Sequence, residues 1–584
     1  MRSVRTENGL ERWDGLFCGL LWLLAALLTR PFVESGLIDD FSYVKSAFVF
    51  ADTHRLVYNG WATATIGWQI AWGGIFAHFF GHTYSAVRLA NFVTSFATVW
   101  IAQAAFRRSG LSRRNAALGA VALALCPLFL PMSVSFMSDI SGLFSILVCY
   151  YCCLRALQSK EDSHVLGWLV AASLLSIVGS TARQIAWMSP LVMVPSAAWL
   201  LHRKRGVLPI AVVLWLLSAA VMLGSMRWFA HQPLSVPEGV IQGAVNARSF
   251  RELLGNMTAA IFCLLFMLVP LLAAWTAKRL RAARVAAVAV GALVVTFVVR
   301  FLTAHAMEKG WAPWTGDILD KIGMLGYRNA WTLGIEPSPL APWARALLSF
   351  IIIALTLWFA LAVINNAHKE SEENAASEWR SLLILTVPFL AAYFVLLCPR
   401  AMWGIVIDRY LLPPIAFGIL FLLRMSQERI GSRLPAISYV LLGLFALFAI
   451  TGTHDWIAMH RARVEAVQRL QSQSVDRLQI EAGYQMDGMA QIDRAGAVID
   501  PRVHYPAEID TRPWTLPDLP HGCREILNPH TPALHPHYFL SASETEASLT
   551  LGEPVCLVQS NEQPQVYGAW LPPFQRRIYI LQRP

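Results

Sequence analysis

Long apolar runs recur along the chain up to about residue 452 and then stop. Runs of roughly 18 or more apolar residues are typical of membrane-spanning helices. They predict a polytopic α-helical membrane protein with about thirteen transmembrane helices. The predicted spans lie near residues 15–33, 83–106, 115–132, 139–157, 165–181, 184–201, 207–229, 256–276, 285–304, 345–365, 381–398, 409–425 and 436–452.

One further apolar stretch, residues 61–80, decides the topology. If it spans, three basic clusters, 107–114, 202–205 and 278–281, lie outside; if it lies flat, all three are cytoplasmic. Short cytoplasmic loops are enriched in Lys and Arg, which favours the flat arrangement. The stretch also places its aromatic and aliphatic side chains on one helical stripe and polar or small ones off it, as interfacial helices do. The stripe consists of Trp68, Trp72, Ile75, Phe76 and Phe79, and Gln69, Gly73 and His78 lie off it.

The resulting topology places the N-terminus in the cytoplasm and the C-terminus outside. The segment Met1–Asp14 carries three arginines before the first apolar run, which resembles a signal peptide. No Ala-x-Ala cleavage site follows, so we expect a retained first helix. The outer segments are then 34–82, 133–138, 182–183, 230–255, 305–344, 399–408 and the tail. Because all the long loops share one face, the chemistry is expected there.

The chain divides into a membrane domain, residues 1–452, and a soluble tail, residues 453–584. In the tail, helical spacing over residues 455–474 is followed by short apolar runs between Pro and Gly. This predicts a small α/β or α+β domain on the outer, periplasmic side. The short runs are 478–480, 497–499, 555–558 and 578–581. His530, His535 and His537 are interpreted as surface residues rather than metal ligands, and whether Cys523 and Cys556 form a disulfide stays open.

Composition and charge exclude several classes of protein. Hydrophobic residues make up 56% of the chain and charged residues 14%, against about 25% charged in an ordinary soluble protein. From Asp455 onward there are 11 Arg, no Lys and 15 acidic residues, and the remainder has 36 basic and 22 acidic residues. The positive charge therefore belongs to the membrane part, where it sets topology. No nucleic-acid or nucleotide-binding motif is present.

Three acidic residues lie at predicted outer helix ends. Asp39 and Asp40 precede an apparent short helix, Phe41–Ala51, just past the first span, and Asp139 opens the span 139–157. Each could be a helix N-cap. However, a cap needs only one acid, and two adjacent carboxylates repel, which raises one pKa toward the range of a general base. An ionisable group at a span end also suggests function. All three are candidate catalytic residues.

Basic residues also lie at the outer face, although Lys and Arg are normally enriched in cytoplasmic loops. Arg183 lies between two predicted spans, and Arg409 with Tyr410 opens the span 409–425. Snorkelling to lipid headgroups is the alternative role. Arginine is well suited to bind phosphate, so we interpret Arg183, Arg409 and Tyr410 as candidate donor-phosphate ligands. Carboxylates beside arginines favour transfer of a sugar from a lipid phosphate to a hydroxyl.

In these motifs the chain resembles the polytopic GT-C glycosyltransferases, specifically the family 39 type that includes protein mannosyltransferases and the lipid A aminoarabinose transferase. The resemblance covers roughly residues 15–425. The motifs, in order, are Asp39-Asp40, Asn59-Gly60, the surface helix 61–80, Arg88, the Cys-Pro-Leu-Phe-Leu stretch at 126–130, Ser138-Asp139 and the Arg409-Tyr410-Leu-Leu-Pro413 segment.

The resemblance implies a bacterial inner-membrane enzyme of the cell envelope with a polyprenyl-phosphate sugar donor and an extracytoplasmic acceptor. It implies that Asp39 is the general base, that Asp139 shapes the acceptor or donor site, and that transfer is inverting. Asp40 stands where the family has Glu. One departure is that the segment after the Asn-Gly turn, Trp61–Thr65, contains no basic residue.

Two other functions remain open at this point. A transporter or flippase of a lipid-linked substrate predicts ionisable residues near span midpoints and related halves of the chain. An O-antigen-type polymerase or ligase would use an oligosaccharide on a diphosphate lipid. The paired acids in the first outer loop favour monosaccharide transfer. Neither a cofactor nor a divalent-metal requirement follows from the sequence.

Overall fold

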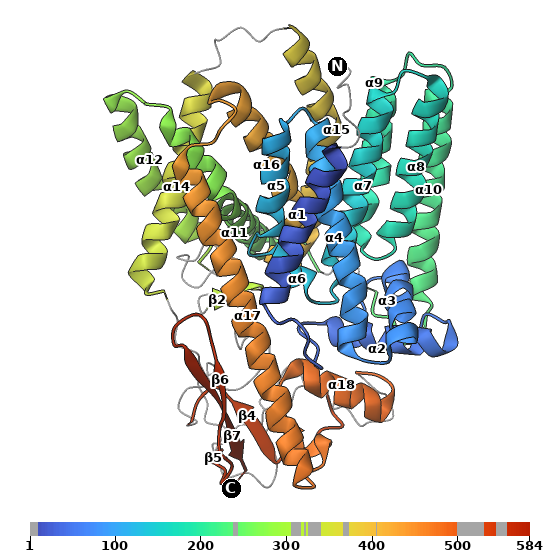
Figure 1. Ribbon diagram of the computed structural model, residues 1–584, viewed down its shortest axis with the longest axis vertical. Helices are drawn as coiled ribbons and strands as arrows, with labels where there is room; N and C mark the ends of the chain where they lie inside the picture. Colours follow the sequence, from blue (N-terminus) through green and yellow to red (C-terminus); the bar gives the residue numbers. More distant parts are fainter. Residues whose placement is uncertain are drawn as a thin grey trace.

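A computed structural model describes residues 10–237, 243–304, 317–320, 323–324, 340–365, 373–404, 406–498, 531–544 and 557–583. Some residues named from the sequence lie outside these ranges. They are two of the three N-terminal arginines, Arg2 and Arg5, the tail histidine His530, and the tail cysteines Cys523 and Cys556. Helices dominate, and they form a membrane bundle with a smaller unit of helix and sheet at one end (Figure 1). The predicted fold class, a polytopic helical membrane protein with a small C-terminal α+β unit, is confirmed.

Within the described residues, ten helices are long and apolar enough to cross a membrane. Each coincides with a predicted span. They are α4 (Tyr84–Arg108), α7 (Ser138–Gln158), α8 (Asp162–Ser180), α10 (Val207–Ala230), α11 (Ala247–Leu272) with its 3₁₀ extension η3 (Ala273–Ala277), α12 (Ala282–Leu302), α14 (Pro342–Asn365), α15 (Glu373–Trp403), η5 (Asp408–Leu411) with α16 (Leu412–Arg429), and α17 (Ala436–Ser472).

The other three predicted spans are shorter or broken helices, so the count of thirteen stays a prediction. The first is α1 (Leu10–Leu28). The third consists of α5 (Arg113–Ala124) and α6 (Phe129–Ser133), and the sixth of η1 (Gln184–Trp187), η2 (Ser189–Met193) and α9 (Val194–Leu200). Proline removes a backbone donor and clashes with the preceding turn. Pro127, Pro190 and Pro195 lie at these interruptions.

The first outer loop contains two short helices, α2 (Asp40–Thr53) and α3 (Gly67–Phe80). With 14 residues, α3 is about 21 Å long, too short for a bilayer core of about 30 Å. Phe79 on its apolar stripe is 74% exposed, whereas Gln69 is buried and donates to the Phe136 carbonyl at 2.7 Å. The helix begins at Gly67 rather than near residue 61, and its length agrees with the prediction that this stretch does not span the membrane.

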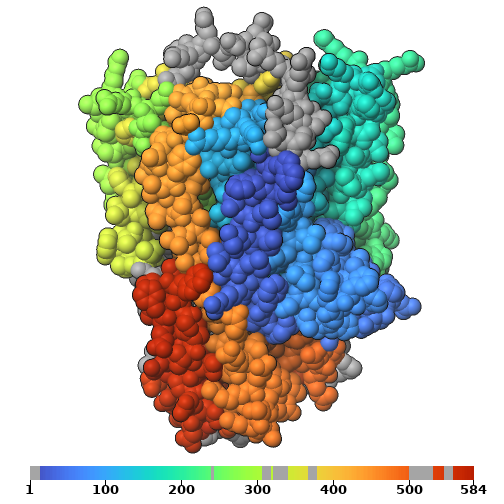
Figure 2. Space-filling model, viewed as in Figure 1, coloured from blue at the N-terminus to red at the C-terminus, as the bar shows by residue number. Residues whose placement is uncertain are grey.

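The C-terminal unit is built around α17, which continues without a break past residue 452. A short helix, α18 (Tyr484–Ala495), follows. The main strand, β7 (Gln575–Gln582), pairs antiparallel with β4 (Tyr538–Ser541), β5 (Val558–Gln559) and β6 (Gln565–Gly568), and β3 (Ile480–Glu481) pairs parallel with β4. In Figure 2 the orange and red surface of this unit lies directly against the blue surface of the first outer loop.

Asp455 joins α17 to the hairpin of β6 and β7. Its carboxylate accepts hydrogen bonds from the backbone N–H groups of Trp570, at 2.6 Å, and Leu571, at 2.9 Å. The His454 ring stacks on the Trp570 ring, with centroids 3.9 Å apart. Since both side chains of α17 are buried, the sheet is fixed to the helix close to the predicted membrane exit.

Candidate functional site

Five charged side chains from distant parts of the chain meet at the end of the bundle that faces the C-terminal unit. They come from the start of α2, the first turn of α7, the connection between α8 and η1, the loop at residue 317, and η5. All five segments belong to the predicted outer face or to its helix ends, so they meet as this topology requires. The residues are Asp39, Asp139, Arg183, Asp317 and Arg409, named here the charged cluster.

Asp39 and Asp40 have different surroundings. Asp39 occupies the N-cap position of α2, but its side chain makes no capping hydrogen bond; instead it pairs with Arg409 Nη2 at 3.1 Å. Asp40 is fully buried, and its carboxylate accepts from the backbone N–H groups of Leu37, Ile38 and Phe136 at 2.7 to 3.0 Å. Asp40 therefore fixes the backbone around Asp39 and is not part of the charged cluster.

A buried arginine supports the same connection. Arg88 on α4 is inaccessible to solvent, and its guanidinium donates to the backbone carbonyls of Val33 and Ser35. Buried carbonyls need such donors. The segment between α1 and α2 is thereby held from both sides, by Arg88 and by Asp40, and the position of Asp39 is determined by these contacts.

Asp139 and Arg183 form the second pair of the cluster. The Asp139 side chain is only 1% exposed and lies 2.9 Å from Arg183 Nη2. The N-cap of α7 is Met137, so Asp139 does not serve as the cap. Arg183 also donates to the Ser138 hydroxyl at 3.0 Å. Its side chain crosses α7 where position 142 is glycine, since a Cβ there would lie 2.9 Å from Arg183 Cδ.

Arg409 is the centre of the cluster. Its Nη2 lies 3.1 Å from Asp39, its Nε 3.1 Å from Asp317 and its Nη1 3.9 Å from Asp139. The side chain is 9% exposed, and its buried Nη1 makes no hydrogen bond with the described residues. A buried N–H without a hydrogen bond costs free energy. Nη1 is therefore available to an oxygen of a bound ligand.

Asp408 brings Asp317 into the cluster. It is fully buried, and its carboxylate accepts from the backbone N–H groups of Ile318 and Leu319 at 2.8 to 3.1 Å. The loop carrying Asp317 is thereby attached to the start of η5, one residue from Arg409. Asp408 is a positioning residue for this loop.

Tyr410 lies between two guanidinium groups. Arg183 is 5.0 Å and Arg400 5.9 Å from the centroid of its ring. The Tyr393 hydroxyl donates to the Tyr410 backbone carbonyl at 2.7 Å, which fixes the residue on α15. Guanidinium groups are attracted to the face of an aromatic ring. Tyr410 therefore contacts both Arg183, which belongs to the charged cluster, and Arg400.

Asp317 and Tyr43, which both lie outside the membrane spans, have shifted pKa values. Burial raises the pKa of Asp317 to about 6; Asp39 and Asp139 add to the rise, and Arg409 and Arg183 oppose it. Burial, and then the charge of Asp39, raises the pKa of Tyr43 above its ordinary value. Tyr43, one turn into α2, is therefore a neutral phenol beside the cluster at neutral pH.

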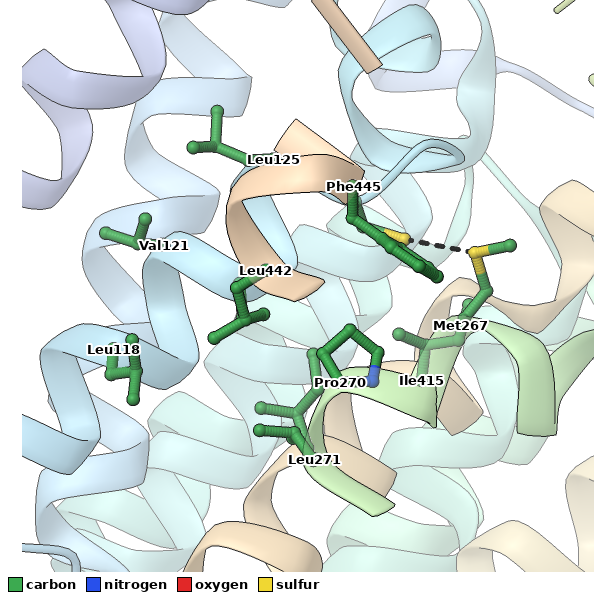
Figure 3. Close-up of a pocket in the computed structure, with 12 residues that line it drawn as sticks. Leu118, Val121, Leu125, Met267, Pro270, Leu271, Ile415, Leu442 and Phe445 are labelled. Atoms are coloured by element: carbon green, nitrogen blue, oxygen red, sulfur yellow. Dashed lines mark hydrogen bonds between the residues drawn. The ribbon is translucent and has the colours of Figure 1, made fainter. Parts of the chain in front are cut away.

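An apolar cavity lies among α5, α11, α16 and α17 (Figure 3). Its volume is about 50 Å³, far below the roughly 300–1,000 Å³ of small-molecule sites. The lining consists of Leu118, Val121, Ala122, Leu125, Cys126, Met267, Pro270, Leu271, Ile415, Ile419, Leu442 and Phe445. The lining contains no acidic, basic or imidazole side chain, so the cavity is apolar. Ile415 follows Arg409 by six residues on η5 and α16, about 9 Å along the axis.

The tail histidines, considered as possible metal ligands, are not part of the charged cluster. His535 and His537 are exposed. Across the ranges that the structure describes, no three His, Cys, Asp or Glu residues come together as a metal site. In the charged cluster itself, the Arg409 guanidinium occupies the space between the carboxylates where a cation would bind.

Sequence reasoning identified Asp39, Asp139, Arg183, Arg409 and Tyr410, and these five lie together. It missed Asp317, Asp408 and Tyr43. The only signal for Asp317 was its place in the outer loop 305–344, on the same face as the other acids. Asp408 is adjacent to the Arg409-Tyr410 motif, and no sequence feature marked it as a functional residue.

Comparison with known proteins gives distant likenesses. No family model and no curated protein matches the chain. Among solved structures, ArnT from Cupriavidus metallidurans bound to undecaprenyl phosphate is 15% identical, with a TM-score of 0.40, over 78% of this chain and 81% of that one. The archaeal oligosaccharyltransferase AglB from Archaeoglobus fulgidus, in complex with an inhibitory peptide and a dolichol-phosphate, is 13% identical, with a TM-score of 0.35, over 79% of this chain and 58% of that one. Both belong to the GT-C superfamily that the sequence motifs indicated.

The raised pKa of Asp317 leads to a prediction about stability. Below about pH 6 the folded protein holds a proton on Asp317 that the unfolded chain releases above about pH 4. The stabilisation from this group is therefore present at low pH and is lost as the pH rises through about 6. Asp317→Asn, neutral at every pH, is expected to reduce the fall in melting temperature between about pH 5 and pH 8. Thermal unfolding in detergent measures this; identical pH dependence in both proteins would contradict it.

Proposed function

We propose that the protein is a glycosyltransferase of the outer face of the bacterial inner membrane. It moves a monosaccharide from a polyprenyl phosphate to a hydroxyl group of an extracytoplasmic lipid, glycan or protein. The N-terminus lies in the cytoplasm, and the C-terminal unit, residues 453–584, lies in the periplasm.

The arrangement around Arg409 carries the proposal. One guanidinium contacts three carboxylates, and its Nη1 is left without a hydrogen bond. Asp39 is the most exposed acid of the cluster, with 25% of its side chain accessible. An acid that must meet an incoming hydroxyl has to be accessible, whereas Asp139 and Asp317 are more deeply buried. Asp39 is therefore the best candidate for the general base.

In the proposed reaction, Asp39 accepts the proton of the acceptor hydroxyl. The hydroxyl oxygen forms a bond with the anomeric carbon of the donor sugar as the bond from that carbon to the phosphate oxygen breaks. The electron pair leaves with the phosphate, whose charge Arg409 and Arg183 stabilise. Preorganised cations at a developing negative charge are among the strongest contributions to catalysis. In-line attack of this kind inverts the anomeric carbon.

The donor lipid is proposed to lie between the helices. Its phosphate would contact Arg183 and Arg409 beside Tyr410. A transporter would instead place its ionisable groups near span midpoints. The charged cluster lies at helix ends and in loops, which favours an enzyme.

A transfer assay on the full chain in nanodiscs tests this proposal. The probes are synthetic undecaprenyl phosphates, each carrying one hexose or pentose, supplied with an extract of envelope lipids and glycans. Mass spectrometry is expected to detect free undecaprenyl phosphate and one newly glycosylated product. Translocation of the same lipids across a vesicle membrane with no sugar transfer would instead identify a flippase.

A further inference from the structure

The turn between β6 and β7 presents apolar side chains that the described residues leave exposed. Trp570 is 41% exposed and Phe574 is 66% exposed. Pro572 and Pro573, between them, are exposed as well. Residues 569–574 are named here the hairpin tip, and in Figure 1 they form the part of the sheet nearest to the membrane bundle. A contiguous exposed apolar surface of this kind marks a contact with a partner or with a membrane.

The hairpin tip is held in one shape by its backbone and by Arg576. The Ala569 N–H donates to the Phe574 carbonyl at 2.8 Å. Arg576 donates to two further backbone carbonyls of the tip, at 3.3 Å each, and its Nη2 lies 3.6 Å from the Asp455 carboxylate. The aromatic side chains are therefore presented by a folded turn that is fixed to α17.

The hairpin tip attaches to the side of α17 that faces lipid. Four exposed apolar residues form one stripe along the part of α17 that lies in the bundle: Ile437, Val440, Leu444 and Leu447. Since α17 is apolar and long enough to span a membrane, this stripe contacts the lipid chains. His454, which stacks on Trp570, follows Leu447 by seven residues, or about two helical turns. It therefore continues the same stripe, and the tip lies on the lipid side of the helix.

The depth of this attachment follows from the length of the helix. α17 begins at Ala436, and the rise from there to Asp455 is about 30 Å, the thickness of the hydrocarbon core of a bilayer. Asp455 accepts hydrogen bonds from two backbone N–H groups of the tip. The tip thus meets α17 where the helix leaves the hydrocarbon core. This is the headgroup region, in which tryptophan is enriched.

An exposed arginine lies next to the hairpin tip. Arg577 is exposed on β7, three residues after Phe574. A guanidinium group binds phosphate well, and an arginine at an interface keeps its charged end in the headgroup layer. The aromatic rings therefore suit the apolar layer of a bilayer and the guanidinium suits its phosphates.

We propose that the hairpin tip is a membrane anchor. Trp570 and Phe574 enter the interface of the phospholipid bilayer beside α17, and Arg577 contacts a lipid phosphate. The anchor fixes the C-terminal unit to the bilayer at a second point besides α17. This inference goes beyond the proposed function and does not depend on it, because it follows from the exposed surface alone.

Photocross-linking of the full chain in nanodiscs of phosphatidylethanolamine and phosphatidylglycerol tests the anchor. Phe574→p-benzoylphenylalanine is expected to give a lipid adduct on the peptide that contains position 574, detected by mass spectrometry after irradiation. Val558→p-benzoylphenylalanine is the matched control. Val558 is 44% exposed but pairs with Gln582 at the other end of β7, so it should give no lipid adduct. Adducts at both positions or at neither, or an adduct of position 574 with another protein chain, would overturn the inference.

A second measurement does not depend on the cross-linker. Phe574→Glu removes the apolar side chain and adds a charge, and it is expected to accelerate hydrogen exchange of residues 569–577 in nanodiscs about tenfold, as the loss of one buried aromatic side chain allows. Val558→Glu should leave this exchange unchanged, and thermal unfolding verifies that both variants fold. Unaltered exchange in folded Phe574→Glu protein would refute the anchor. Neither measurement uses sugar transfer, so the proposed function is tested separately.

Discussion

Replacement of Asp39 by asparagine is expected to lower sugar transfer at least about 100-fold, because general-base contributions are typically 10²–10⁴-fold. Asparagine keeps the size of the side chain and a contact with Arg409, so expression and folding should be retained. The amide cannot accept the proton of the acceptor hydroxyl. Initial rates of product formation with a saturating donor measure the effect.

The matched control is Asp52→Asn. Asp52 is another carboxylate of α2, but it is largely exposed and pairs with His82 at the other end of the helix. It should transfer sugar at the wild-type rate. If Asp39→Asn retained more than about a tenth of wild-type activity, Asp39 would not be the base, since this loss is smaller than such a role provides.

Replacement of Arg409 by lysine is expected to reduce kcat by about 10²–10³-fold, as the loss of a preorganised charge in an active site does. The guanidinium contacts Asp39, Asp139 and Asp317 through three different nitrogen atoms. The single ammonium group of lysine cannot make these three contacts at once. At least one carboxylate is left unpaired, so the melting temperature should fall as well. Steady-state kinetics and thermal unfolding measure the two effects.

Arg429→Lys serves as the comparison for Arg409→Lys, because Arg429 ends the span that η5 and α16 form, at the end opposite Arg409. It should leave kcat within about twofold of wild type, as surface substitutions have small effects. A kcat for Arg409→Lys close to that of Arg429→Lys would rule out Arg409 as the residue that stabilises the leaving phosphate.

Much of the fold could be predicted from the sequence because the bilayer imposes it. Apolar length marked each of the ten long spans, and the bias of basic loops predicted that residues 61–80 do not span, in agreement with the short helix α3. Apolar length could not reveal that the helices of the spans at 115–132 and 184–201 are interrupted. Prolines are tolerated within membrane helices, as Pro270 in α11 and Pro388 in α15 are, so their presence alone does not locate a break.

The site was predictable only in part. Charge at a helix end singled out Asp39, Asp139, Arg183 and Arg409, because an ionised group is costly there unless it has a use or a partner. Asp39 and Asp40 are equivalent in sequence, and only the three backbone amides around Asp40 separate their roles. The partners in the cluster are up to 370 residues apart in the chain. No local pattern encodes such a contact.

Because α17 runs without a break from the bilayer into the C-terminal unit, the angular phase of one helix sets where that unit lies. An α-helix turns by roughly 100° per residue. A single residue inserted between Gly452 and Trp456 would therefore rotate the C-terminal unit relative to the first outer loop. An insertion of about seven residues would restore the phase but move the unit by about 10 Å along the helix axis, so neither change keeps the unit in its place against that loop.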